Sequence, residues 1–225
     1  MKKTLLALVL ALAAGFAAHA QIGVIGGWTT SKTNIDGAWN PDVKNMSLYH
    51  LGVAYNFDLG PFFSLLPALA YQVKGSTVSD LSGARTLASK AGYLELELGM
   101  QLGLDLLILR PFFLFEPFVG YQVIGDGERL NVFSLDSRFS SSSYNSSDLN
   151  RYLDQAKNKF EVGFGVGGGV ELLKHLQFSV QWFMNVGKLY DGNKLAKDAV
   201  TSYIVDNYKD LKNYSGVKIT LGLFF

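Results

Sequence analysis

Alternation of hydrophobic and polar residues is the dominant pattern along the chain, and it is clearest over residues 92–105. Leucine or methionine occupies every second position from Leu94 to Leu104, and glutamate, glutamine or glycine occupies the positions between. Successive side chains of an extended chain point to opposite faces. The segment is therefore predicted to be a β-strand with one hydrophobic face and one polar face.

Seven further segments alternate in a similar way, which brings the expected number of strands to about eight. They span residues 22–30, 47–57, 63–75, 111–124, 160–172, 176–187 and 214–225. The connections near residues 59, 108 and 174 are short, whereas those near 38, 83, 142 and 200 are long. Short helices are predicted within two of the long connections, at 147–157 and around 197–207.

This order of short and long connections is typical of a transmembrane barrel with short periplasmic turns and longer external loops. Strands of about 10 residues are long enough to cross a bilayer when tilted. The sequence therefore predicts an all-β fold, an antiparallel, eight-stranded, up-and-down transmembrane β-barrel. Aromatic residues are expected outward at both rims, Phe57, Phe63, Phe113, Phe178 and Phe225 at the periplasmic rim and Trp28, Tyr49, Tyr71, Tyr121 and Phe160 at the external rim.

A soluble lipocalin-like barrel is the alternative fold. It would place the hydrophobic faces inside, around a ligand, and would leave glutamates such as Glu95 and Glu97 on its surface. In a soluble barrel, the short loops and the long loops need not lie at opposite ends. The observed order of loop lengths therefore favours the transmembrane barrel.

In the transmembrane barrel, the polar face of each strand lines the lumen. The predicted luminal polar network consists of Glu95, Glu97, Glu116, Glu161, Glu171, Lys74, Lys218 and His50, with several glutamines. Charges in a narrow interior must be paired or hydrogen-bonded. The network can be interpreted as a filling that stiffens a small barrel or as a narrow cation path. We favour the filling, because eight strands leave an interior about wide enough for side chains.

The final strand has a sharply defined pattern. Its outward face carries Val217, Ile219, Leu221, Leu223 and Phe225, and the chain ends on that aromatic residue. A barrel must leave no strand edge exposed to lipid. The strand at 214–225 is therefore predicted to close the barrel by pairing with the first strand.

The first twenty residues have a different pattern. Lys2 and Lys3 precede a hydrophobic run at 5–14, and Ala18-His19-Ala20 resembles a cleavage site. These are the three parts of a secretory signal peptide. We therefore expect residues 1–20 to be removed and residues 21–225 to form the barrel domain of an exported protein located in the outer membrane.

Composition excludes some functions and leaves others open. The 20 basic and 19 acidic residues are nearly balanced, which gives no support for nucleic-acid binding. Cysteine is absent, so the chain offers no disulfide and no thiolate metal site. Gly163 to Gly168 matches the dinucleotide motif G-x-G-x-x-G, but it lies inside an alternating strand rather than before a helix. We expect no cofactor, no metal site and no catalytic residue.

Several segments resemble the small outer-membrane β-barrel family of Bacteroidetes often called PorT-like. The resemblance covers residues 21–225 and rests on GYLELELGMQLG, PFFLFEPFVGYQVIG, KFEVGFGVGGGVELLKHLQFSVQW and the terminal GVKITLGLFF. It implies a barrel whose C-terminal strand is recognised by the barrel-assembly machinery. It implies no activity, and no functional residue is carried over from it.

The expected function is that of a monomeric, non-catalytic barrel embedded in outer-membrane lipid, with a structural or surface-interaction role. Any external partner would meet the long loops, because loops on a rigid scaffold commonly carry binding. A narrow pore for ions or small solutes is the first alternative, and a lipid-modifying enzyme is the second. Ser47 and His50 lie close in sequence but are predicted on opposite faces of their strand, which argues against a nucleophile–base pair.

Overall fold

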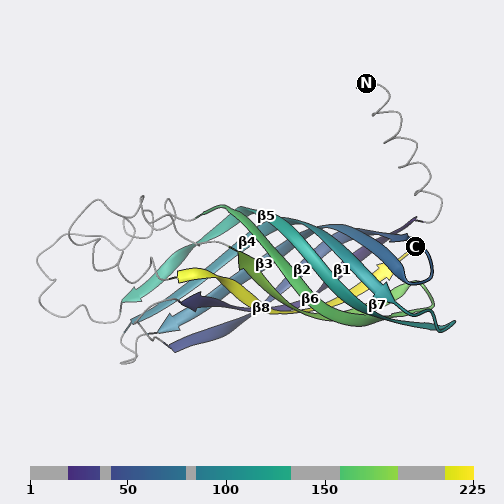
Figure 1. The fold of residues 1–225 in the computed structure, drawn as a ribbon. Helices are drawn as coiled ribbons and strands as arrows, with labels where there is room; N and C mark the ends of the chain where they lie inside the picture. The colour runs from purple at the N-terminus through teal and green to yellow at the C-terminus, as the bar shows by residue number, and fades with distance from the viewer. Residues whose placement is uncertain (1–19, 36–41, 80–84, 133–157, 187–210) are drawn as a thin grey trace, which may run out of the picture.

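The computed structural model describes residues 20–35, 42–79, 85–132, 158–186 and 211–225. These residues form eight strands: β1 (Ala20–Ile35), β2 (Asp42–Asp58), β3 (Phe63–Ser79), β4 (Arg85–Gly103), β5 (Leu109–Val132), β6 (Phe160–Leu172), β7 (Leu176–Val186) and β8 (Leu211–Phe224). Each strand pairs antiparallel with its neighbours in sequence, and β8 pairs with β1, so the sheet closes into a barrel (Figure 1). The predicted eight-stranded, antiparallel, up-and-down barrel is confirmed.

The seam between β8 and β1 joins the two ends of the sequence. Trp28 lies opposite Ile219, and Gly23 lies opposite Phe224. The amide of Phe225 extends the ladder by donating a hydrogen bond to the carbonyl of Ile22 over 2.8 Å. The predicted pairing of the first and last strands is therefore correct. The role of the C-terminal residue as an assembly signal stays a prediction.

Several strands are longer than the alternation predicted. Residues 31–35 and 42–46 were expected to belong to a loop, yet they extend β1 and β2. In the next hairpin, Ser76 lies opposite Ser89 and Ser79 lies opposite Thr86, so part of the expected loop at 76–90 is paired strand. Serine, threonine, lysine and asparagine are frequent in these extensions. Their backbone ladders form without the hydrophobic alternation on which the prediction relied.

The start of the longest predicted loop is also strand, because β5 continues to Val132. The two helices expected at 147–157 and 197–207 lie outside the described residues, and so does almost all of the expected signal peptide. Its removal stays a prediction. Within the described part of the chain, no helix is long and hydrophobic enough to span a membrane.

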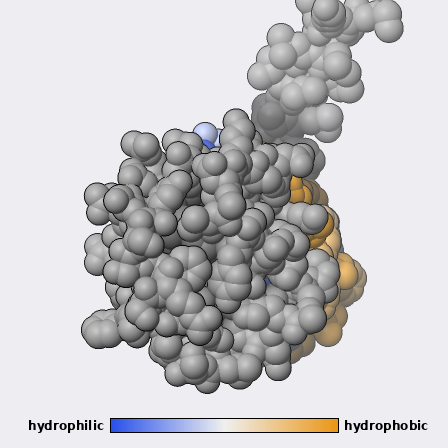
Figure 2. Space-filling view, turned by 90° about the vertical axis from the view of Figure 1, so that its left-hand side faces the viewer, coloured by the Kyte–Doolittle hydropathy of each residue, from blue (hydrophilic) through white to orange (hydrophobic). Residues whose placement is uncertain are grey.

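The barrel is hydrophobic outside and polar inside. Leu94, Leu96, Leu98 and Leu102 on β4 are exposed, and the intervening Glu95 and Glu97 are buried. Where the described side wall is visible in Figure 2, it is mainly hydrophobic. The rim aromatics predicted to face outward are exposed or half-buried. This arrangement is the reverse of the lipocalin-like alternative, which requires a hydrophobic interior.

Alternation along residues 63–75 predicts that Val73 of β3 faces outward with Leu69 and Tyr71, but this residue is buried. Val73 is only 2 % exposed. It lies where the pairing of β2 with β3 shifts register, between Asn45 and His50. There, Ser31 of β1 contacts β3 directly. Its Oγ donates to the carbonyl of Gly75 and accepts from the Gly75 amide, over 2.7 and 2.8 Å. At this irregularity, Val73 is therefore buried although it alternates with the luminal Gln72 and Lys74.

Candidate functional site

The candidate site is the polar interior of the barrel. The structure places all eight residues of the predicted luminal network inside, and none of them is more than 7 % exposed. They reach the interior because they occupy inward positions of six different strands, β2 to β6 and β8. Strand alternation alone puts them on the same side of the sheet, and barrel closure brings the strands face to face.

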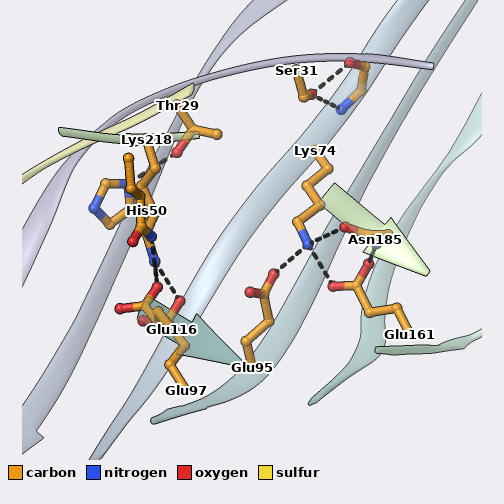
Figure 3. A network of polar contacts seen from close by, with 12 residues as sticks. Thr29, Ser31, His50, Lys74, Glu95, Glu97, Glu116, Glu161, Asn185 and Lys218 are labelled. Carbon is orange, nitrogen blue, oxygen red and sulfur yellow. Dashed lines mark hydrogen bonds and ion pairs between the residues drawn. The ribbon is translucent and has the colours of Figure 1, made fainter. Parts of the chain in front are cut away.

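Lys74 of β3 lies at the centre of the first group of contacts. Its Nζ is 3.0 Å from Oε1 of Glu95 and 2.9 Å from Oε1 of Glu161, and it donates to Oδ1 of Asn185 over 3.1 Å (Figure 3). The amide of Asn185 in turn donates to Glu161. One ammonium thus joins strands β3, β4, β6 and β7 across the lumen.

Aromatic side chains surround the same ammonium. Its Nζ lies 4.3 Å from the ring centroid of Phe118, 5.2 Å from that of Phe183 and 5.5 Å from that of Tyr93. All three rings are buried. A cation over a desolvated ring is stabilised by the ring quadrupole. The rings therefore contribute to holding the cation and also fill the lumen at this level.

Lys218 of β8 is the centre of a second group. Its Nζ lies 2.8 Å from Oε1 of Glu97 and 2.6 Å from Oε1 of Glu116, as Figure 3 shows. Nε2 of Gln181 donates to the same Glu116 oxygen over 2.6 Å. This group joins β4, β5, β7 and β8.

His50 of β2 lies in a hydroxyl-lined environment. Its Nδ1 is 3.0 Å from Oγ1 of Thr29, and its Nε2 is 3.0 Å from Oγ1 of Thr220. Both ring nitrogens are therefore satisfied by hydroxyls. The neighbouring Ser47 is exposed, so the two side chains lie on opposite faces of β2 as predicted.

A third group contains one residue that was not predicted. Arg110 was assigned to a short connection, but it is the second residue of β5 and is buried. Its Nη1 is 3.7 Å from Oε2 of Glu171 and donates to Oε1 of Gln101 over 3.3 Å. Gln177 donates to the same Glu171 oxygen over 2.6 Å. The inward position of Glu171, which lies opposite residue 110 on the neighbouring strand, was the signal that could have identified this arginine.

The inward glycines of β6 make room for these side chains. A Cβ at Gly163 would collide with the ring of Phe118, and one at Gly169 would lie 2.7 Å from Cζ of Phe112. On β5, a Cβ at Gly120 would lie 2.7 Å from Oε1 of Glu161. The glycine run is therefore a packing feature inside a strand, as its alternation indicated, and not the start of a nucleotide-binding helix.

The space between the second and third groups is small. A cavity of about 20 Å³ lies between the second and third groups, lined by residues that include Glu97, Lys218 and Gln101. That volume holds about one water molecule. Among the described residues, no three His, Asp or Glu side chains are placed to hold a metal ion. The arrangement can lock strands together across the lumen.

The fold defines the class of the protein as a small, closed, antiparallel β-barrel. The sequence matches no known family and no curated protein. Among solved structures it is similar to Ail, the attachment invasion locus protein of Yersinia pestis, with 12 % identity, a TM-score of 0.42, and coverage of 92 % of this chain and 99 % of that one.

Two further solved structures are similar to the chain. One is Neisserial surface protein A, with 9 % identity, a TM-score of 0.42, and coverage of 92 % of this chain and 99 % of that one. The other is the outer membrane protein OprG of Pseudomonas aeruginosa, with 13 % identity, a TM-score of 0.41, and coverage of 92 % of this chain and 96 % of that one. Likeness at this level carries no argument about function. The architecture rests on the strand pairing of this chain.

Proposed function

We propose that the chain is an integral outer-membrane β-barrel with a filled lumen and a non-catalytic, structural or surface-interaction role. The observation that supports this function best is that the barrel is hydrophobic outside and polar inside, the reverse of a water-soluble barrel. Leucine, valine and aromatic side chains cover the outer wall, whereas two lysines, an arginine and five glutamates are buried in the lumen. A hydrophobic wall of this kind is stable in lipid and unfavourable in water.

The filled lumen is supported by the cross-barrel ion pairs. The Lys74 group and the Lys218 group each connect four strands, and the rings of Phe118 and Phe183 pack against the first of them. Ions would have to break these contacts in order to pass. Surface interaction is then assigned to the external connections, which lie outside the described residues. Membership of the PorT-like group and a monomeric state belong to the same proposal.

Conductance tests the filled lumen. We expect the purified protein, reconstituted in a planar bilayer, to produce no reproducible channel, because salt bridges and aromatic rings, rather than water, fill the lumen. A pore is the competing function. Reproducible cation-selective channels whose preference disappears in the Glu95→Gln/Glu97→Gln double variant would contradict the proposal.

The non-catalytic role has a separate test. We expect lipid mass spectrometry of cells with and without the protein to give the same acyl pattern, because Ser47 and His50 lie on opposite faces of β2. An acyl change that requires the folded barrel would favour the lipid-modifying enzyme instead.

A further inference from the structure

Hydrophobic side chains continue from the outer wall onto the tips of two adjacent hairpins, at the end of the barrel that carries the short turns. Leu106, Leu107 and Ile108 in the β4–β5 turn are 57, 98 and 63 % exposed, and Leu173 in the β6–β7 turn is 67 % exposed. The amide of Leu173 donates to the carbonyl of Ile108 over 2.8 Å, so the two turns lie side by side. We call these four residues the hydrophobic tip.

Two leucines of the tip occupy a backbone conformation that leucine rarely adopts. Leu107 has a φ of 68° and Leu173 a φ of 52°, and Lys174 beside it has a φ of 61°. Hairpin turns with positive φ favour glycine, asparagine or aspartate, because a Cβ is strained there. Large hydrophobic residues thus stand where small or polar ones would fit the turn better and would suit water better. Such outliers point to a function of the side chains themselves.

The hydrophobic surface runs without interruption from the outer wall to the tip. Leu102 on the outer face of β4 and Leu104 just beyond its end are exposed and lead directly to Leu106. Asp105 continues the inward series of Gln101 and Gly103, so by alternation it faces the lumen mouth rather than the outer wall.

An open groove of about 390 Å³ adjoins this surface, and its lining residues include Phe62, Leu104 and Phe113. Its dimensions and hydrophobic walls suit part of an acyl chain. The tip and the groove are therefore extensions of the wall that the proposed function places in lipid.

Three backbone amides of the two turns are hydrogen-bonded within the protein. The amide of Leu106 donates to the carbonyl of Leu109 over 2.9 Å, and the amide of Ile108 donates to the carbonyl of Leu106 over 2.8 Å. The amide of Leu173 is bonded as described above. A lipid environment requires that backbone polar groups be satisfied within the protein. A turn that relied on water for these bonds would not meet that requirement.

The neighbouring β2–β3 turn on the same rim is more polar. It carries Asp58, Gly60 and Pro61, all exposed, beside the hydrophobic Leu59 and Phe62. In Figure 1 the tip of the β4–β5 hairpin (teal) extends farther along the barrel axis than the β2–β3 turn (blue). The hydrophobic surface therefore reaches farther along the axis at one hairpin than at the next, which a barrel standing upright in a flat bilayer would not need.

We propose that the hydrophobic tip is embedded in the hydrocarbon of the periplasmic leaflet, while Asp58, Gly60 and Pro61 of the β2–β3 turn lie in water, so that the barrel axis is inclined in the membrane. This inference rests on the proposed membrane location. Lys174 follows the tip directly, and its long side chain reaches back to the headgroup phosphates.

Spin labels can test this placement, because the chain has no cysteine of its own. Single variants Leu107→Cys, Leu96→Cys and Pro61→Cys report on the tip, the outer wall and the neighbouring β2–β3 turn. Each is labelled with a nitroxide, reconstituted in dimyristoylphosphatidylcholine vesicles and checked for heat-modifiable migration. Power saturation then compares collisions with oxygen, which concentrates in hydrocarbon, and with a water-soluble nickel chelate.

We expect the oxygen-to-nickel collision ratio at position 107 to be lipid-like, as at position 96, and to exceed that at position 61. A water-like ratio at 107 with a lipid-like ratio at 96 would overturn the tip placement and leave the membrane barrel intact. Water-like ratios at all three positions would overturn the membrane barrel. A label at 107 that neither reagent reaches, with spin–spin broadening that grows with protein density, would show a second copy at the tip and would also overturn the proposal.

Discussion

Replacing Lys74 with methionine is expected to lower the free energy of unfolding by about 3–5 kcal/mol, the cost typical of removing one partner of a buried ion pair. Methionine retains the length of the side chain but removes the ammonium that lies between Glu95 and Glu161. The two carboxylates would then remain in the lumen without their shared cation. Urea unfolding of the reconstituted barrel, followed by heat-modifiable migration on a gel, measures the loss.

Lys32→Met is the matched control, because Lys32 is an exposed lysine on β1. We expect it to change the free energy of unfolding by less than about 1 kcal/mol, as is usual for an exposed charge. Adding Glu95→Gln and Glu161→Gln to Lys74→Met should recover most of the lost stability, since no carboxylate is then left unpaired. Wild-type stability in Lys74→Met alone would show that the cross-lumen group does not hold the barrel together.

The second large effect is expected at the seam that closes the barrel. A Cβ at Gly27 would collide with the backbone carbonyl of Ile219 on β8, which cannot move aside without disturbing the ladder. We expect Gly27→Ala to lower the free energy of unfolding by about 1–3 kcal/mol, the range typical of overpacking. The same urea titration measures it.

The adjacent glycine supplies the control. A Cβ at Gly26 would meet Cδ1 of Leu51 at 3.2 Å, and that atom is the end of a flexible side chain. Gly26→Ala is therefore expected to have little effect, although both substitutions add one methyl group to β1. Equal losses from the two variants would mean that strand propensity, and not the close approach at the seam, determines the outcome.

Much of the fold could be predicted because the wall of such a barrel produces a regular alternation of hydrophobic and polar residues in the sequence. On β4 the alternation from Leu94 to Leu104 fixes which side faces out, and barrel closure then determines where Glu95 and Glu97 point. The same reasoning placed Lys74 and Lys218 inside without any knowledge of their partners. Which glutamate pairs with which lysine could not be predicted, because it depends on the stagger between strands that are distant in sequence.

The predictions failed where backbone pairing continues without hydrophobic alternation. The polar ends of β1 and β2 and the continuation of β5 to Val132 are held by ladder hydrogen bonds, which leave no period-two signal in hydrophobicity. Val73 was expected to be exposed, but it is buried where the register of β2 and β3 shifts. Arg110 was missed because the strand was predicted to begin at residue 111, so its inward alternation was not extended to 110.

The central claim is that the hydrophobic outer wall faces the lipid of the outer membrane. Separating the membranes of expressing cells on a density gradient, after a urea wash that strips peripheral proteins, tests it most directly. The protein is predicted to remain in the outer-membrane fraction, to require detergent for extraction and to migrate heat-modifiably on a gel. Recovery as a folded protein in the soluble periplasmic fraction would contradict the claim.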